Sequence, residues 1–114
     1  MFKVNSDGSI ELTRGDNAAI EIVLTDMDGN PYEYLDGDQI YLRIKKQVKD
    51  SIPVLIEKVG DITTSTFELV ESDTKNLDFG DYRYEVELVT ADKEHYTVIT
   101  DTKFTIGKEI EVHG

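Results

Sequence analysis

Short runs in which apolar and polar residues alternate constrain the fold of this chain more than any other feature. In such a run every second side chain lies on the same face of a β-strand, so that one face packs inward and the other meets water. The clearest run covers residues 82–89, where apolar residues alternate with charged ones. The pattern predicts an all-β protein with about seven strands, at residues 9–13, 20–24, 40–46, 54–58, 66–69, 82–89 and 96–99, with residues 104–112 closing the chain after a bulge expected at 101–102.

Turn residues separate these runs. The segment 26–31 combines Asp-Gly with Asn and Pro, which favours a turn, and residues 91–94 are expected to close a hairpin with a four-residue loop. Residues 71–77 lack the alternation. We expect Ser72 or Asp73 to cap one short turn of helix in that segment.

About seven short strands in roughly a hundred residues are typical of an immunoglobulin-like antiparallel β-sandwich, in which two sheets bury their alternating faces against each other. A chain of 114 residues has enough apolar surface for one such core. We therefore expect residues 1–114 to form a single domain, with residues 1–8 as an N-terminal extension strand. The expected centre of the core consists of Ile22, Leu42, Tyr84 and Val86.

Residues Asp78, Gly80 and Tyr82 have the Asp-x-Gly-x-Tyr spacing of a tyrosine corner. In this motif glycine permits a sharp bend before the strand, and the tyrosine hydroxyl bonds back to the backbone a few residues upstream. An ordinary turn at the entrance of a strand has the same sequence. Both interpretations stay open at this point.

The charge of the chain excludes several classes of partner. It has 12 Lys and Arg against 24 Asp and Glu, a formal net charge of −12. Such a surface repels phosphate backbones and anionic lipid headgroups, which argues against nucleic acid and against a membrane as partners. The chain has no cysteine, so it forms neither a disulfide nor a thiolate metal site. Its first residues lack the apolar core of a secretion signal, and an intracellular start is expected.

Residues suited to catalysis are few, and we expect a protein that is not an enzyme, with no catalytic, cofactor-binding or metal-binding residues. The imidazoles are His95, in a predicted hairpin, and His113, beside the last residue, where a productive orientation is hard to hold. The segment 26–30 resembles a calcium loop but lacks the later bidentate glutamate. The tripeptide at residues 14–16, Arg-Gly-Asp, is interpreted as a tight connection between two strands rather than as an adhesion motif.

Tyrosines are the candidates for an exposed interaction surface. Their rings combine apolar area with a polar tip, which suits a protein or a sugar as partner. The alternative is that some of them cover the ends of the core. The candidates are Tyr32, Tyr34, Tyr41 and Tyr96.

The N-terminal extension offers a second candidate interaction surface. Residues 1–5 are expected to add a strand to a partner's sheet, with Phe2 and Val4 as the residues that enter pockets. In this mode of recognition the main-chain hydrogen bonds supply affinity and the alternate side chains supply specificity.

The order of four motifs carries a resemblance to a known family. Thr-Arg-Gly-Asp occupies residues 13–16, Asp-Gly-Asn-Pro occupies 28–31, a later strand ends in Lys-Lys at 45–46, and Gly-x-Tyr-x-Tyr-x-Val-x-Leu spans 80–88. Over residues 9–106 the chain resembles small phage and prophage structural proteins of Gram-positive bacteria. It is similar to the immunoglobulin-like N-terminal domain of phage baseplate upper proteins.

The resemblance implies a non-enzymatic phage or prophage structural protein, associated with the tail or baseplate, that assembles by docking to other phage structural proteins or to itself. It also implies a location in the host bacterial cytoplasm during assembly and in the virion afterwards. The alternative is a carbohydrate-binding or adhesin-like module with a glycan as ligand, because one fold serves many functions. A ring-lined groove with acidic neighbours favours a sugar, whereas exposed strand edges and an apolar patch favour assembly.

Overall fold

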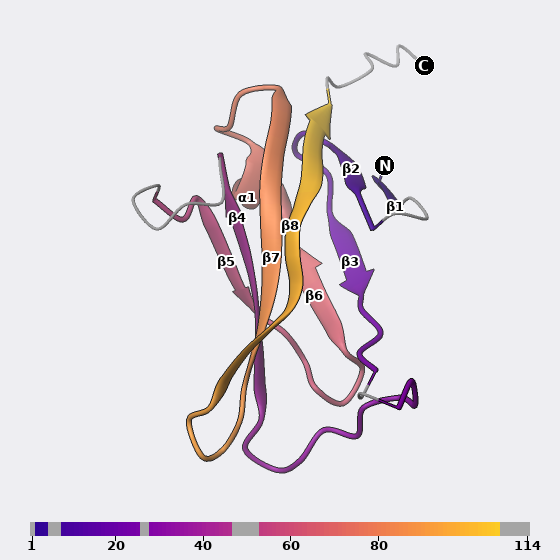
Figure 1. Cartoon of the computed structure of the whole chain (residues 1–114). Coiled ribbons are helices and arrows are strands. Elements are labelled where there is room, and N and C mark those ends of the chain that lie inside the picture. Colours follow the sequence, from indigo (N-terminus) through magenta and orange to yellow (C-terminus); the bar gives the residue numbers. More distant parts are fainter. Residues whose placement is uncertain (1, 5–7, 26–27, 47–52, 108–114) are drawn as a thin grey trace.

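The computed structural model describes residues 2–4, 8–25, 28–46 and 53–107, and of residues 2–4, 100 and 101 it describes the backbone alone (Figure 1). This part of the chain forms eight strands and one helical turn. They are β1 (Phe2–Val4), β2 (Ile10–Thr13), β3 (Ala18–Glu21), β4 (Gln39–Lys45), β5 (Ile56–Val59), β6 (Thr66–Leu69), α1 (Glu71–Thr74), β7 (Gly80–Val89) and β8 (His95–Gly107). Among these residues no helix is long and apolar enough to cross a bilayer.

The strands form two sheets that face each other in an all-β, sandwich-like fold, as the alternation predicts (Figure 1). The large sheet has the order β1-β2-β8-β7-β4-β5, and the small sheet pairs β3 with β6.

One strand pair differs from the expected antiparallel arrangement. Strand β2 runs parallel to β8, with Ile10 beside Phe104 and Leu12 beside Ile106. Parallel neighbours require a long crossover between them. The connection after β2 begins with a turn in which the Asp16 N–H donates to the Thr13 carbonyl oxygen at 3.1 Å. It then leads to the small sheet and not back along the large one.

Inward-facing side chains of both sheets form one core. The apolar residues that the alternation places inward in β2, β4, β6 and β7 are all buried. The four residues expected at its centre are also buried, although Ile22 lies nearest the edge with 7% of its surface exposed. Full burial of one side chain of this size stabilises the fold by roughly 1.5–3 kcal/mol. The bulkiest side chains with no exposed surface are Phe67, Phe104, Ile40, Ile44 and Val86.

The residues of the predicted corner lie at the entrance of β7. Gly80 has a φ of 136°, in the region that favours glycine. The Tyr82 hydroxyl donates a hydrogen bond to the carbonyl oxygen of Asp78 at 2.8 Å, which is the bond that defines a tyrosine corner. Two residues later, the Tyr84 hydroxyl donates to the carbonyl oxygen of Gly8 at 2.6 Å and ties the segment before β2 to the core.

The N-cap of the single helical turn lies two residues before the nearer of its two predicted positions. Val70 is the N-cap residue, and Asp73 lies at the third helical position, so the prediction that Ser72 or Asp73 caps the turn is wrong in position. The Asp73 carboxylate instead accepts the backbone N–H of Val70 at 2.7 Å. Buried Thr74 accepts the N–H of Gly15 at 2.8 Å, which joins the turn to the connection after β2.

Two details at one end of the sandwich differ from the predicted pattern. The β7–β8 hairpin has a tighter loop than predicted, because the Thr90 N–H already donates to the Glu94 carbonyl at 2.9 Å, and Lys93 adopts a left-handed φ of 66°. Strand β3 ends at Glu21, although the alternation continues to Leu24. Ile22 and Leu24 therefore remain inward-facing after the strand has ended, whereas Val23 is exposed.

Candidate docking groove

The two sheets differ in length, and this leaves one end of the large sheet uncovered. Strands β3 and β6 have four residues each, whereas β7 has ten and β8 thirteen. In Figure 1 the lower part of the β7–β8 hairpin extends below the small sheet, while the segment that follows β3 descends on the other side of the view.

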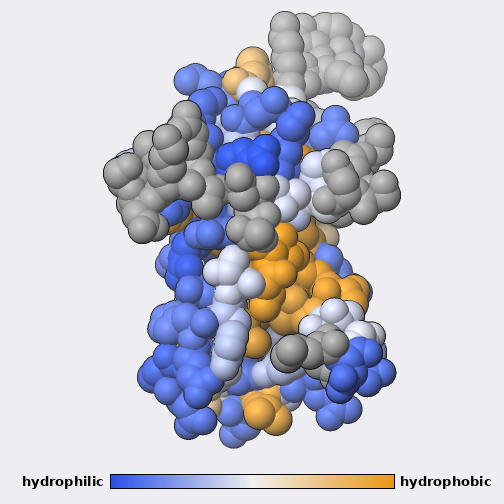
Figure 2. Space-filling model, viewed as in Figure 1, coloured by the Kyte–Doolittle hydropathy of each residue, from blue (hydrophilic) through white to orange (hydrophobic). Residues whose placement is uncertain are grey.

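An open groove of about 400 Å³ lies at this uncovered end. Its floor is aliphatic, with Leu88 from β7, Val98 from β8 and Leu24 from the segment after β3. The face shown in Figure 2 carries a patch of hydrophobic residues beside β8, where Figure 1 places the end of the small sheet. The complete lining is Leu24, Thr25, Tyr32, Leu88, Thr90, Tyr96 and Val98.

Tyr32 forms one wall of the groove, and its position is fixed from behind. Its hydroxyl donates to Oδ2 of Asp38 at 2.8 Å, and its ring meets that of Tyr34 edge-on at 5.4 Å between centroids. The Tyr34 hydroxyl shares a hydrogen bond of 2.7 Å with the Ser65 hydroxyl. Burial and the bond to Asp38 raise the pKa of Tyr32 to about 12, so this hydroxyl stays protonated and remains a donor.

Asp38 is the residue of this site that sequence reasoning missed. It is 4% exposed; its Oδ2 also accepts the N–H of Leu35 at 2.9 Å, and its Oδ1 has no hydrogen-bond partner among the described residues. The alternating pattern does indicate its inward orientation. Asp38 lies two residues before the inward-facing Ile40, so it faces the same side at the entrance of β4. A buried carboxylate of this kind is costly unless it is bonded, and its bonds hold the aromatic wall in place.

Tyr96 forms the opposite wall and is half exposed. Its hydroxyl donates to the carboxylate of Glu94, and this hydrogen bond raises the pKa of Tyr96. Tyr96 lies directly opposite Leu88 in the register of β8 and β7, so these two side chains lie on the same face of the sheet. Both tyrosine hydroxyls at the groove are therefore already bonded to carboxylates of the chain itself.

The loops that border the groove are strongly acidic. The loop before β4 approaches the hairpin loop so closely that a Cβ at Gly37 would lie 2.7 Å from the Cβ of Ala91. Lys93 is the one Lys or Arg in residues 28–38 and 90–95. The acidic residues in the same two segments are Asp28, Glu33, Asp36, Asp38, Asp92 and Glu94.

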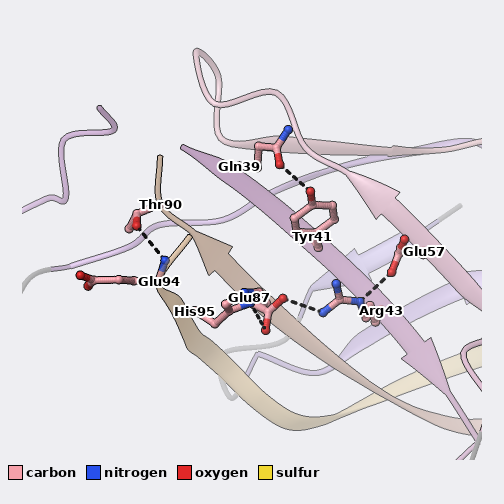
Figure 3. Close-up of polar contacts among 8 residues, drawn as sticks. All are labelled: Gln39, Tyr41, Arg43, Glu57, Glu87, Thr90, Glu94 and His95. Carbon is pink, nitrogen blue, oxygen red and sulfur yellow. Dashed lines mark hydrogen bonds and ion pairs between the residues drawn. The ribbon is translucent and has the colours of Figure 1, made fainter. Parts of the chain in front are cut away.

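The outer face of the large sheet carries a separate ionic cluster (Figure 3). Arg43 bonds through Nε to Glu57 at 2.7 Å and through a terminal nitrogen to Glu87 at 3.0 Å, while Nδ1 of His95 lies 3.4 Å from Glu87. Burial alone would raise the pKa of Glu87, but the hydrogen bond and charge of Arg43 outweigh it and hold that pKa below its ordinary value. The cluster links β5, β4, β7 and β8 and stabilises the sheet.

The predicted tyrosine surface is divided between two faces. Tyr32 and Tyr96 border the groove, and Tyr34 packs behind Tyr32. Tyr41 lies on the outer face of the large sheet, where its hydroxyl donates to Gln39 at 2.6 Å and its ring lies 5.1 Å from the Arg43 guanidinium carbon (Figure 3).

The N-terminal strand pairs within this chain. In β1, Phe2 lies opposite Leu12 and Val4 opposite Ile10, antiparallel to β2. The side chains of Phe2 and Val4, predicted to enter a partner's pockets, lie outside the described residues. β1 and β5 are the outer strands of the large sheet, and each leaves one edge without a strand partner in the part of the chain described.

The described residues contain no group of three or more His, Asp or Glu side chains placed to hold a metal ion. His95 is largely exposed and contacts Glu87, and His113 lies outside the described residues. No protein-family model matches the chain, and no curated protein matches it at a significant level. Function is therefore inferred from the groove, its charge and the strand edges.

Proposed function

We propose that this protein is a non-enzymatic docking component of a phage or prophage tail or baseplate. The observation that carries the docking role is the open apolar groove at the uncovered end of the sandwich, bordered by Leu88, Val98 and Tyr96. Apolar surface of this kind is costly in water, and its burial against another protein is favourable. Other phage structural proteins are the partners in this proposal.

Two further features support docking over chemistry. The free edges of β1 and β5 offer backbone groups to a partner's strand. The two tyrosines that line the groove are each bonded to a carboxylate, since Tyr32 donates to Asp38 and Tyr96 to Glu94. A catalytic site instead needs a nucleophile or base within reach of a substrate.

The phage assignment rests on the order of the sequence motifs, and the particle itself is the test. In the bacterium that carries the gene, DNA damage is used to induce prophages, and released particles are purified by density gradient. We expect mass spectrometry to find this chain in the virion at a fixed ratio to tail proteins. Intact particles that lack the chain would contradict the phage role and would leave the docking groove untouched.

A carbohydrate-binding module is the second candidate function, because two tyrosine rings, Tyr32 and Tyr96, border one groove with acidic residues nearby. Aromatic rings of this kind suit the faces of sugar rings. However, a sugar also needs several free hydrogen-bond partners, and both tyrosine hydroxyls are already bonded. A glycan array with the purified chain tests this candidate, and binding of one glycan class would favour it.

A further inference from the structure

We propose that the groove binds a short extended peptide segment of a partner protein, in which one or two aliphatic or aromatic side chains are flanked by Lys or Arg. This proposal rests on the docking function and names the chemistry of its partner. The apolar side chains would occupy the groove, and the cations would lie over its acidic rim.

The lining of the groove argues for apolar side chains. The groove is lined by three aliphatic side chains, Leu24, Leu88 and Val98, and by the rings of two tyrosines. The volume of about 400 Å³ lies in the lower part of the range for small-ligand sites, roughly 300–1,000 Å³. Both tyrosine hydroxyls are bonded, and the Thr90 hydroxyl oxygen accepts the N–H of Glu94 at 3.2 Å, so the lining adds only the Thr25 hydroxyl as a further polar side chain. A few polar contacts and a large apolar floor fit a hydrophobic peptide segment better than a polyhydroxylated sugar.

The charge of the rim argues for flanking cations. Five exposed acidic residues and one lysine occupy the two segments around the groove, and the whole chain carries −12. Glu94, bonded to Tyr96, lies at the groove itself, and its attraction for a cation weakens as salt rises. A second copy of the chain would bring the same negative rim against this one, which disfavours self-association through the groove.

The aromatic wall is held in place before a partner arrives. Tyr32 is bonded to Asp38 and packed against Tyr34, and Asp38 is bonded in turn to the N–H of Leu35. A side chain that is already ordered loses little rotamer freedom on binding. The groove therefore needs no large rearrangement to accept a peptide.

The test is a selection of random twelve-residue peptides on the immobilised full chain, followed by fluorescence polarisation with the most enriched peptide. We expect enriched sequences with one or two large apolar residues flanked by Lys or Arg, and weaker binding as salt rises. Tyr96→Ala, at a half-exposed position, is expected to weaken binding about tenfold or more. Thr25→Lys, which places a cation in the groove at an exposed position, is expected to weaken it to a similar degree.

Tyr41→Ala is the matched control, because Tyr41 also lies in a strand and donates its hydroxyl to the residue two positions earlier, but on the outer face. It should leave the affinity within about twofold. The proposal is overturned if no peptide is enriched, if enriched peptides are acidic, or if Tyr41→Ala weakens binding as much as Tyr96→Ala. It is also overturned if light scattering shows dimers that Tyr96→Ala dissociates. None of these outcomes bears on the presence of the chain in virions, which the particle analysis measures separately.

Discussion

Replacing Tyr82 with phenylalanine removes one hydroxyl from the tyrosine corner and keeps the ring. The ring is 3% exposed, so its packing is expected to be unchanged, and the lost interaction is the 2.8 Å hydrogen bond to the carbonyl oxygen of Asp78. A hydrogen bond between neutral groups contributes about 1 kcal/mol to stability. Because Asp78 is exposed, water reaches its freed carbonyl and adds no large penalty. For a domain of 114 residues this loss lowers the melting temperature by about 4 °C.

The measurement is urea unfolding followed by far-ultraviolet circular dichroism, at pH 7, for the wild type and two variants. Tyr41→Phe serves as the control because it removes an even shorter bond, of 2.6 Å to Gln39, that is exposed to solvent. We expect it to cost less than about 0.5 kcal/mol, as surface changes usually do. If Tyr82→Phe unfolds at the same urea concentration as the wild type, or if Tyr41→Phe costs as much, the corner does not stabilise this fold.

Three further changes test other parts of the structure. Gly60→Ala would place a Cβ 2.6 Å from Ile40 and 2.8 Å from Phe67, so it should destabilise the core by about 1–3 kcal/mol in urea unfolding. Glu87 has a folded pKa below its ordinary value of 4.5, so its ion pair stabilises the protein above that pH and is lost as the pH falls further. As the pH falls through this range, the free energy of unfolding of Glu87→Gln should decrease by roughly 1 kcal/mol less than that of the wild type. In the folded protein the pKa of Tyr32 is about 12, above its ordinary 10.0, so its contribution to the free energy of unfolding is complete below pH 10 and is lost between pH 10 and 12. The Tyr32→Phe variant should therefore lose less stability than the wild type over that interval.

Each of these expectations has a result that would contradict it. A Gly60→Ala protein as stable as the wild type would mean that the core has room where the structure shows none. If Glu87→Gln loses as much stability at low pH as the wild type, other carboxylates are responsible for that loss. A tyrosine absorbance titration in which all six tyrosines ionise with midpoints near pH 10 would show that Tyr32 is neither buried nor bonded as described.

Local pattern was enough to predict which residues face inward. In residues 40–44 and 82–88 the parity of apolar residues is unbroken, and the structure buries them as predicted. Parity depends only on the pleat of a single strand, so no knowledge of its neighbours is needed. The same parity places Asp38 on the inward face, but a carboxylate at the end of a turn-rich segment is ordinarily solvated, so its burial is visible only in the structure.

The partners of each strand and the length of each sheet could not be predicted in the same way. The parallel contact of β2 with β8 joins residues more than ninety positions apart, Ile10 and Phe104, and no local signal specifies it. The groove arises because β3 ends at Glu21 although alternation continues to Leu24. Strand ends depend on the pairing of the whole sheet, so the uncovered end of the large sheet is visible in the structure alone.

The central claim is that the uncovered end of the sandwich is the docking surface. Methyl nuclear magnetic resonance of the full chain tests it directly, with the most enriched peptide added in steps. The account predicts that the methyl signals of Leu24, Leu88 and Val98 shift together and saturate. Shifts confined to the exposed methyl groups near the β5 edge, such as those of Leu55 and Val59, would place docking at the strand edge and contradict it.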